Sequence, residues 1–283
     1  MSNWLEVVMP VRNPGNKFME SIRSLATQTS RNFGVLISDN FSTQGVEFIE
    51  AARLELENAG IDVRVVQPPY ELGRVEHWNW AHAASNADWM KPLFAGDLIA
   101  TTYVAQLRER ILANPLAHVA RCEFTFTTET GVITTTAPGS ATKLTREEFL
   151  RYFPQDGNWM GGPINFAYSR QAWMSLGGYS PQLPSCADYN LYVSMILRYG
   201  VELIRESLAT FQLHAQRFSH GIRGRRVNAC FEVWVTLRQA RNYCLNVGLP
   251  WPRHGVARGT WKQIEVDYWA AWKAPVSRLL RRR

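Results

Sequence analysis

Three aspartates lie where a carboxylate could take part in chemistry. Asp39 and Asp97 each follow a short apolar run, and Asp188 comes at the start of a helical pattern. A carboxylate can hydrogen-bond a ribose, ligate a hard divalent cation or remove a proton as a general base. Two of them also have an ordinary structural explanation: Asp39 could be a turn residue or a helix N-cap, and Asp188 could be an N-cap. The strands and helices around the aspartates therefore decide between a chemical and a structural role.

The first hundred residues alternate between short apolar runs and helical patterns. We expect strands at residues 4–11, 33–38, 61–66 and 89–94, and helices near residues 18–26, 48–56 and 71–84. Such alternation predicts a parallel sheet with right-handed crossovers, whose ligand crevice lies at the carboxyl ends of the strands. Asp39 and Asp97 fall at those ends.

The second half of the chain is less regular. The patterns predict two strands around a turn, at residues 119–128 and 131–136. They also predict helices at residues 146–153, 170–176, 189–199, 227–244 and 260–272. We find no internal repeat and no low-complexity segment.

The composition fits a globular protein with a sizeable core. The chain has 283 residues, of which 46% are hydrophobic and 19% charged, enough for one large or two fused domains. No apolar run approaches the roughly 20 residues of a membrane-spanning helix, and no basic and apolar signal region opens the chain, so we expect a cytoplasmic location. The cysteines lack the paired spacing of a zinc site or a disulfide framework.

Positive charge gathers in the C-terminal part. From residue 221 onward there are 13 Lys and Arg against 3 Asp and Glu. A basic segment of this kind suits nucleic acid, an anionic glycolipid or an anionic membrane, and a solvated surface is the alternative. Tryptophans and arginines near the end, in residues 268–273 and 279–283, would allow peripheral contact with the inner membrane face. A disordered basic tail is the competing interpretation.

The segment after the second expected strand carries polar groups suited to a nucleotide. Asp39 is followed by Asn40, Ser42 and Thr43, which places a carboxylate and hydroxyls at the expected crevice. Pro10, Val11 and Asn13 come from the end of the adjoining strand. A base and ribose could lie between these two strand ends.

Taken together, the motifs resemble those of GT-A fold glycosyltransferases of the family 2 type. They lie at residues 8–13, 24–28, 37–42, 71–79, 89–97, 161–170, 177–179 and 187–191, in the order and spacing of that family. The resemblance covers roughly residues 5–215. It implies an α/β GT-A domain over residues 1–220, with a mostly parallel nucleotide-sugar-binding half at 1–98 and an acceptor half at 99–220. A basic helical extension would follow at residues 221–283.

The resemblance implies a donor site built from a small set of residues. The nucleotide-binding positions are Pro10, Val11, Asn13, Asp39, Arg74 and Asp97. Family members present two acidic residues where this chain has Ala95, Gly96 and a single Asp97. A divalent cation, Mn²⁺ or Mg²⁺, could still be held by Asp97 and His214 if phosphates and waters supply the other ligands. A structural role for His214 is the alternative.

On the acceptor side, the resemblance makes Asp188 the general base. An inverting transfer needs a carboxylate near the acceptor hydroxyl, and a helix N-cap is the competing role for this residue. Trp159 and Gly162 would contact the acceptor, since aromatic faces suit the apolar face of a sugar ring. Core packing is an equally good account of Trp159.

The sequence therefore predicts a hexosyltransferase-like, inverting glycosyltransferase. It would move a sugar from a nucleotide-sugar donor, with a UDP-sugar favoured, to a glycan or lipid-linked acceptor in cell-surface polysaccharide synthesis. A non-catalytic GT-A-like binding module is the alternative, suggested by the incomplete acidic pair. Nucleic-acid binding would account for the basic residues 223–226, but the chain carries no recognised nucleic-acid module, so we expect no nucleic-acid partner.

Overall fold

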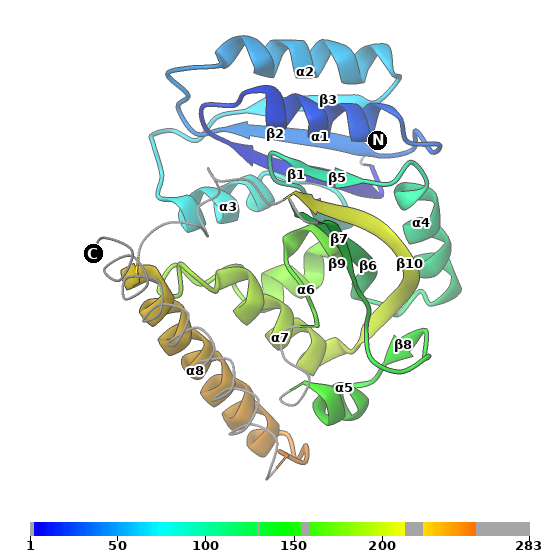
Figure 1. Cartoon of the computed structure of the whole chain (residues 1–283), viewed down its shortest axis with the longest axis vertical. Coiled ribbons are helices and arrows are strands. Elements are labelled where there is room, and N and C mark those ends of the chain that lie inside the picture. Colours follow the sequence, from blue (N-terminus) through cyan, green and yellow to red (C-terminus); the bar gives the residue numbers. More distant parts are fainter. Residues whose placement is uncertain (1–2, 129–130, 154–158, 213–222, 253–283) are drawn as a thin grey trace, which may run out of the picture.

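A computed structural model describes residues 3–128, 131–153, 159–212 and 223–252 (Figure 1). These residues form one ten-stranded sheet with helices on both faces. The strand order is β3-β2-β1-β4-β9-β6-β10-β5, with β7 paired to β6 and β8 paired to β10. The predicted α/β class is confirmed.

The N-terminal part of the described chain, which is the predicted nucleotide half, is a parallel sheet with helical crossovers, as the sequence predicts. Its strands are β1 (Leu5–Val11), β2 (Gly34–Asp39), β3 (Asp62–Val66) and β4 (Trp89–Pro92). Its helices are α1 (Asn16–Ala26), α2 (Val46–Asn58) and α3 (Arg74–Ala83). Strands β3, β2, β1 and β4 all run in the same direction. Their carboxyl ends therefore meet at one edge.

The part that follows, which is the predicted acceptor half, mixes strand directions. Its strands are β5 (Asp97–Ile99), β6 (Val119–Thr128), β7 (Gly131–Thr135), β8 (Lys143–Leu144), β9 (Phe166–Ser169) and β10 (Val201–Gln212). Strand β9 runs antiparallel to both β4 and β6, whereas β10 runs parallel to β6. Short β5 pairs antiparallel with β10 at the far edge of the sheet. Its helices are α4 (Tyr103–Ala113), α5 (Arg146–Tyr152), the 3₁₀ helix η1 (Pro163–Asn165), α6 (Arg170–Ser175) and α7 (Ala187–Tyr199).

Alternation along the strands divides the core into two layers. Val7 and Met9 of β1 pack with buried residues of α1, α2 and α4, while Val8 packs with buried residues of α3, α6 and α7. This is the two-residue period of a strand that is buried on both faces. The unbroken apolar run of β1 is thereby explained.

Polar contacts tie helix α3 to the end of β2 and to the loop between α6 and α7. His77 Nε2 lies 2.8 Å from Ser38 Oγ at the end of β2. The side chain of Asn79 pairs with the backbone N–H and carbonyl of Tyr179, both at 2.8 Å. Burial lowers the pKa of His77 to about 4. The imidazole is therefore neutral at pH 7, and the hydrogen bond to Ser38 lacks a buried charge.

A second buried histidine extends this connection into the acceptor half. His82 Nδ1 donates to the Trp78 carbonyl at 2.7 Å, so Nε2 is the acceptor and receives the Tyr168 hydroxyl at 2.9 Å. The Tyr168 and Tyr179 hydroxyls lie 2.6 Å apart. Burial lowers the pKa of His82 to about 4, which keeps this chain of hydrogen bonds uncharged.

The last described element, α8 (Arg223–Asn246), lies along α7 (Figure 1). The residues that α8 buries against the body are Glu232, Thr236, Leu237, Ala240 and Cys244. The described part of the predicted C-terminal extension is thus packed on the acceptor half. The helix predicted at residues 260–272 lies outside the described residues. Among the helices that the structure describes, none combines the length and apolar character needed to cross a membrane.

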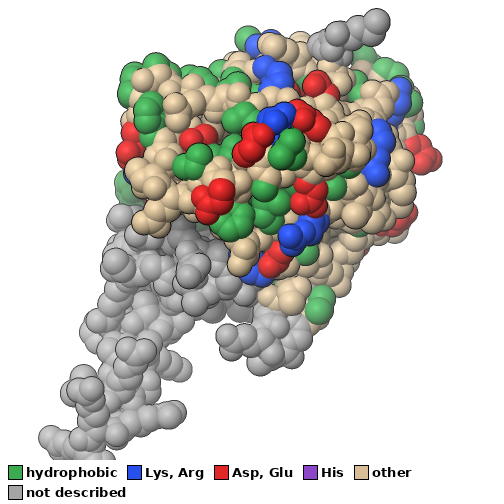
Figure 2. Space-filling model, turned by 90° about the horizontal axis from the view of Figure 1, so that it is seen from above, with side chains coloured by type: hydrophobic (Ala, Val, Ile, Leu, Met, Phe, Trp, Pro, Cys, Tyr) green, Lys and Arg blue, Asp and Glu red, His purple; other side chains and the backbone are tan. Residues whose placement is uncertain are grey.

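The outer face over α1 and α2 carries both signs of charge. Figure 2 shows acidic and basic side chains interspersed there. Arg53 pairs with Glu50 and Glu57, and Arg23 lies 3.9 Å from Glu55. Exposed pairs of this kind contribute little to stability, because water and salt screen them. They give this face no strong field of either sign.

Candidate active site

Asp39 lies where the sequence places it, at the carboxyl end of β2 beside the end of β1. Val11 is its register partner, and Pro10 is opposite Ser38. The carboxylate of Asp39 is 8% exposed. It accepts the Ser42 backbone N–H at 3.1 Å and the Gln67 side-chain amide at 3.3 Å. These contacts fix the carboxylate at the sheet edge.

Asn13 organises the loop that follows β2. Its side-chain oxygen accepts the backbone N–H groups of Thr43 at 2.9 Å and Gln44 at 3.3 Å. Its own N–H donates to Ser42 Oγ at 2.8 Å. Asn13 has a φ of 50°, a left-handed conformation that asparagine tolerates better than most residues. The structure therefore gives Asn13 a supporting role next to the predicted nucleotide position.

Asp97 opens strand β5 rather than ending β4. It is 2% exposed and lies opposite Phe211 of β10. Gly96, with a φ of 90°, donates its N–H to Ser21 Oγ at 2.9 Å. Because that φ favours glycine, the turn accounts for the absence of an acidic side chain at position 96.

Asp97 is the predicted metal ligand within the described residues. His214, its predicted partner, lies outside them, three positions beyond Phe211 in the sequence. Among the described residues no group of three or more His, Cys, Asp or Glu could hold a metal ion. The described donor set thus offers one carboxylate, which could bind an ion only together with oxygen ligands from elsewhere.

Arg74 reaches from the nucleotide half to the acceptor half. It begins α3, its guanidinium lies 4.6 Å from the centre of the Trp78 ring, and it donates to the Pro184 carbonyl. The Trp78 ring in turn packs 4.7 Å from Phe94 and 5.5 Å from Tyr179. This stack links the segment before Asp97 to the loop before α7.

Arg12, by contrast, is engaged on the surface. It pairs with Glu71 at 2.6 Å, and both side chains are about half exposed. Arg217, which could also bring positive charge to a diphosphate, lies outside the described residues. Of the two described arginines, Arg12 and Arg74, the second has the contacts that better suit a site between the two halves.

Asp188 is the second residue of α7. The N-cap position is Cys186, so the competing interpretation of Asp188 as an N-cap is wrong. Its Oδ1 accepts the Tyr189 N–H at 2.9 Å. Asp188 keeps part of its surface exposed, yet burial of the carboxyl raises its pKa, against smaller opposing effects of the Tyr189 N–H and Arg74. A raised pKa makes the carboxylate a stronger base than an ordinary aspartate.

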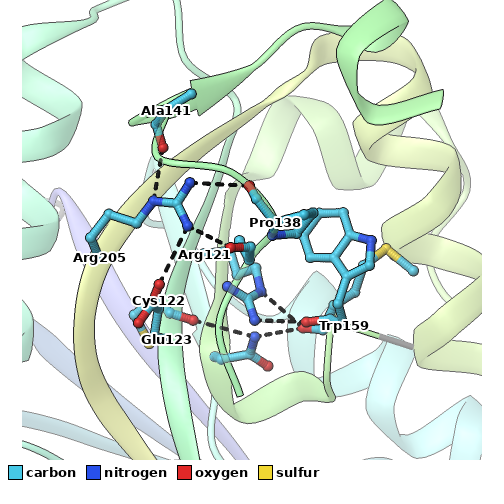
Figure 3. Close-up of polar contacts among 10 residues, drawn as sticks. Arg121, Cys122, Glu123, Pro138, Ala141, Trp159 and Arg205 are labelled. Carbon is cyan, nitrogen blue, oxygen red and sulfur yellow. Dashed lines mark hydrogen bonds and ion pairs between the residues drawn. The ribbon is translucent and has the colours of Figure 1, made fainter. Parts of the chain in front are cut away.

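Trp159 is 6% exposed, and its described contacts are those of a core residue. Its ring packs 5.9 Å from Phe149. Figure 3 shows the buried guanidinium of Arg121 directed at this segment, where it donates to the carbonyls of Trp159 at 2.7 Å and Met160 at 3.1 Å. Burial lowers the pKa of Arg121 to about 10, so it stays charged at neutral pH. Contact between Trp159 and an acceptor stays a prediction.

The two adjacent glycines after Met160 differ in what they require. Gly161 has a φ of 84°, and an added Cβ would lie 2.4 Å from the Phe124 ring. Gly162 has open space at the same place, and its N–H donates to the Asn165 side chain at 3.1 Å. Gly161 is therefore needed for the turn. The predicted acceptor contact of Gly162 stays a prediction.

Sequence reasoning missed two buried charged residues near the site. Lys91 is fully buried, and its Nζ donates to the carbonyls of Pro92, Pro163 and Ile164. Burial lowers its pKa to about 8. A lysine within the apolar run 89–94 was the available signal. The second missed residue is Glu232. It could have been noticed in the sequence because it is the one acidic residue of α8.

Comparisons with known proteins show what the chain is similar to in sequence and fold. No family model matches the chain. A curated protein of Haemophilus influenzae (strain ATCC 51907 / DSM 11121 / KW20 / Rd), named "Uncharacterized glycosyltransferase", is 25% identical over 253 residues, which cover 86% of this chain and 81% of that protein.

Solved structures with a similar fold are also glycosyltransferases. S. aureus TarS 1–349 in complex with UDP-GlcNAc aligns with a TM-score of 0.64 and 15% identity, over 82% of this chain and 66% of TarS 1–349. Mannosyltransferase PcManGT from Pyrobaculum calidifontis, in complex with GDP-Man and Mn²⁺, aligns with a TM-score of 0.59 and 15% identity, over 99% of this chain and 79% of that one. GalNAc-T7 with UDP, GalNAc and Mn²⁺ aligns with a TM-score of 0.58 and 15% identity, over 84% of this chain and 50% of GalNAc-T7.

This chain spans 65% of TarS 1–349 in its UDP complex and 43% of the longer TarS structure. The comparisons confirm the GT-A fold and the resemblance to glycosyltransferases. They do not single out the family 2 type.

Proposed function

We propose that the chain is an inverting glycosyltransferase that moves a sugar from a nucleoside-diphosphate donor to a glycan or lipid-linked acceptor. The observation that carries the proposal is the connection through α3. Phe94, in the segment before Asp97, packs on Trp78, and Trp78 lies against Arg74, which interacts electrostatically with Asp188 at the start of α7. His77 of the same helix contacts Ser38 at the end of β2. These interactions support a site shared by the donor carboxylates and the candidate base. A UDP-sugar is the favoured donor.

The nucleotide would lie across the ends of β1 and β2. Asp39 is held in place by Ser42 and Gln67, and the carboxylate can accept a ribose or base N–H or O–H. Pro10 and Val11 would line the base through backbone and apolar contacts. The neighbours TarS and PcManGT were solved with UDP-GlcNAc and GDP-Man, which supports a diphosphate nucleotide here.

We expect Asp39→Ala to weaken binding of UDP by about 1–3 kcal/mol, the scale of a lost charge-assisted hydrogen bond. Titration calorimetry measures this directly. Asp62→Ala is the matched control, because Asp62 is an exposed aspartate at the opposite end of neighbouring β3 and should leave affinity unchanged. Equal affinity of the Asp39 variant and the parent would refute the assignment.

The leaving diphosphate needs positive charge as the glycosidic bond breaks. Arg74 supplies a guanidinium at the start of α3, where backbone N–H groups also favour an anion. A divalent cation held by Asp97 and His214 is the further candidate, and it would neutralise the diphosphate oxygens. PcManGT and GalNAc-T7 were solved with Mn²⁺.

If Asp97 ligates a cation, Mn²⁺ should tighten UDP binding to the parent protein, and Asp97→Asn should remove that gain while leaving metal-free binding intact. Calorimetry with and without Mn²⁺ separates the two effects. Asp88→Asn, an exposed aspartate just before β4, is the control. Metal-independent affinity in the parent would instead favour a leaving group stabilised by arginine.

Asp188 is the proposed general base. Burial raises the pKa of its carboxyl, and part of the residue remains exposed to an incoming acceptor. The carboxylate would take the proton of the acceptor hydroxyl as that oxygen attacks the anomeric carbon, and the nucleoside diphosphate would leave from the opposite face. Attack from the opposite face inverts the anomeric configuration.

Asp188→Asn should lower transfer by roughly 10²–10⁴-fold, because the amide cannot take the proton. UDP binding and the melting temperature should change little, since the Asn oxygen can still accept the Tyr189 N–H. Glu147→Gln, an exposed acid in the first turn of α5, is the matched control and should keep parental activity. Transfer by the Asp188 variant at the parental rate would remove Asp188 from the mechanism.

A non-catalytic GT-A-like binding module is the second candidate, favoured by the single carboxylate in residues 95–97. It predicts nucleotide or glycan binding without any consumption of donor. A role in cell-surface polysaccharide synthesis and a cytoplasmic location, with peripheral contact at the inner membrane face, belong to the proposal as well. The basic residues 253–283 that would make this contact lie outside the described residues.

A further inference from the structure

Glu232 of α8 lies 4% exposed and is directed at the start of α7. Its Oε2 accepts the backbone N–H groups of Ser185 at 2.7 Å and Cys186 at 2.8 Å. A buried carboxylate needs partners of this kind to offset the loss of water. Nothing in the proposed chemistry so far uses this residue.

The contact fixes the two residues that lead into α7. The side chain of Cys186 at the N-cap accepts none of the first N–H groups of the helix, and the Cys186 N–H also donates to the Leu183 carbonyl at 3.1 Å. Glu232 adds an acceptor from another helix, two and three residues before Asp188. Its negative charge also lies at the positive end of the α7 dipole. The start of α7 is thus set by α8.

We propose that Glu232 is a positioning residue for Asp188, holding the start of α7 in place and strengthening the base by its charge. This inference rests on the proposed function. It makes α8 a part of the catalytic apparatus, where the sequence suggested only a basic extension.

The charged and titratable groups facing Asp188 come from several elements. Arg74 of α3 favours the ionised form, and Glu232 of α8 disfavours it. Tyr179, from the loop before α7, and Tyr192, on α7, have pKa values raised by burial and are neutral. Burial and Glu232 therefore act together to raise the pKa of Asp188, and Arg74 opposes them.

The packing of α8 supports the same role. One turn into α7, the Asn190 amide donates to Thr236 Oγ1 at 3.1 Å and to Gln239 at 2.8 Å. Buried Leu237, Ala240 and Cys244 continue the contact along the helix. These contacts fix the position of α7 along α8 and its rotation about its own axis.

The test is an NMR titration of the side-chain carboxyl carbons in the full chain, with the Asp188 resonance assigned from Asp188→Asn. Glu232→Gln keeps an oxygen for the two N–H groups and removes the charge. We expect it to lower the pKa of Asp188, because a negative charge that opposes its ionisation is removed. The acidic limb of kcat for sugar transfer should move to lower pH by the same amount, with donor KM unchanged.

Thr236→Val is the matched control, because it removes a contact between α7 and α8 without changing charge. It should leave both the pKa of Asp188 and the acidic limb in place. A purely structural role for Glu232 predicts that the two variants lower the melting temperature and leave the Asp188 titration unchanged. That result would overturn the inference.

A measurement on the parent protein covers the case in which Glu232→Gln does not fold. In the parent protein the amides of Ser185 and Cys186 should be protected from hydrogen exchange, because both donate to buried Glu232. Rapid exchange of both amides would overturn the inference. If the parent protein transferred no sugar while Glu232→Gln still shifted the Asp188 titration as expected, the proposed function would be refuted. The coupling between Glu232 and Asp188 would still stand.

Discussion

The anchoring of α3 by two asparagine side chains is the constraint on which the site depends. Asn40, just after β2, pairs with the backbone of Leu72 just before α3, and Asn79 of α3 pairs with the backbone of Tyr179. Each asparagine both donates and accepts, so neither segment can shift without breaking two hydrogen bonds. Arg74 and Trp78 lie between these two anchoring points.

Two buried cationic side chains hold the segment of residues 159–164 in place. Lys91 binds carbonyls at Pro163 and Ile164, and Arg121 binds those at Trp159 and Met160. An irregular segment exposes carbonyls that no strand partner can satisfy, and a buried charged donor satisfies several at once. Because removing either cation would leave buried carbonyls unpaired, the segment has one well-defined path.

The sequence predicted the parts of the fold that depend on local pattern. The alternation of apolar runs and helices gave the parallel half, and the position of Asp39 beside Val11 followed from that alternation. Asp97 was placed at the end of β4, whereas it opens β5 beside β10, because antiparallel pairing of a three-residue strand leaves little local signal. Glu232 could not be assigned a role, since its partners lie 46 and 47 residues away in the chain.

The central claim is that this fold carries out inverting transfer from a nucleotide sugar. It is tested most directly by ¹H NMR of the parent protein incubated with α-linked UDP-sugars and Mn²⁺, with water as the acceptor. The anomeric coupling constant shows which sugar anomer forms before mutarotation. The account predicts slow release of the β-anomer, abolished by Asp188→Asn. Release of the α-anomer would contradict inversion, and UDP binding without any consumption of donor would show a binding module.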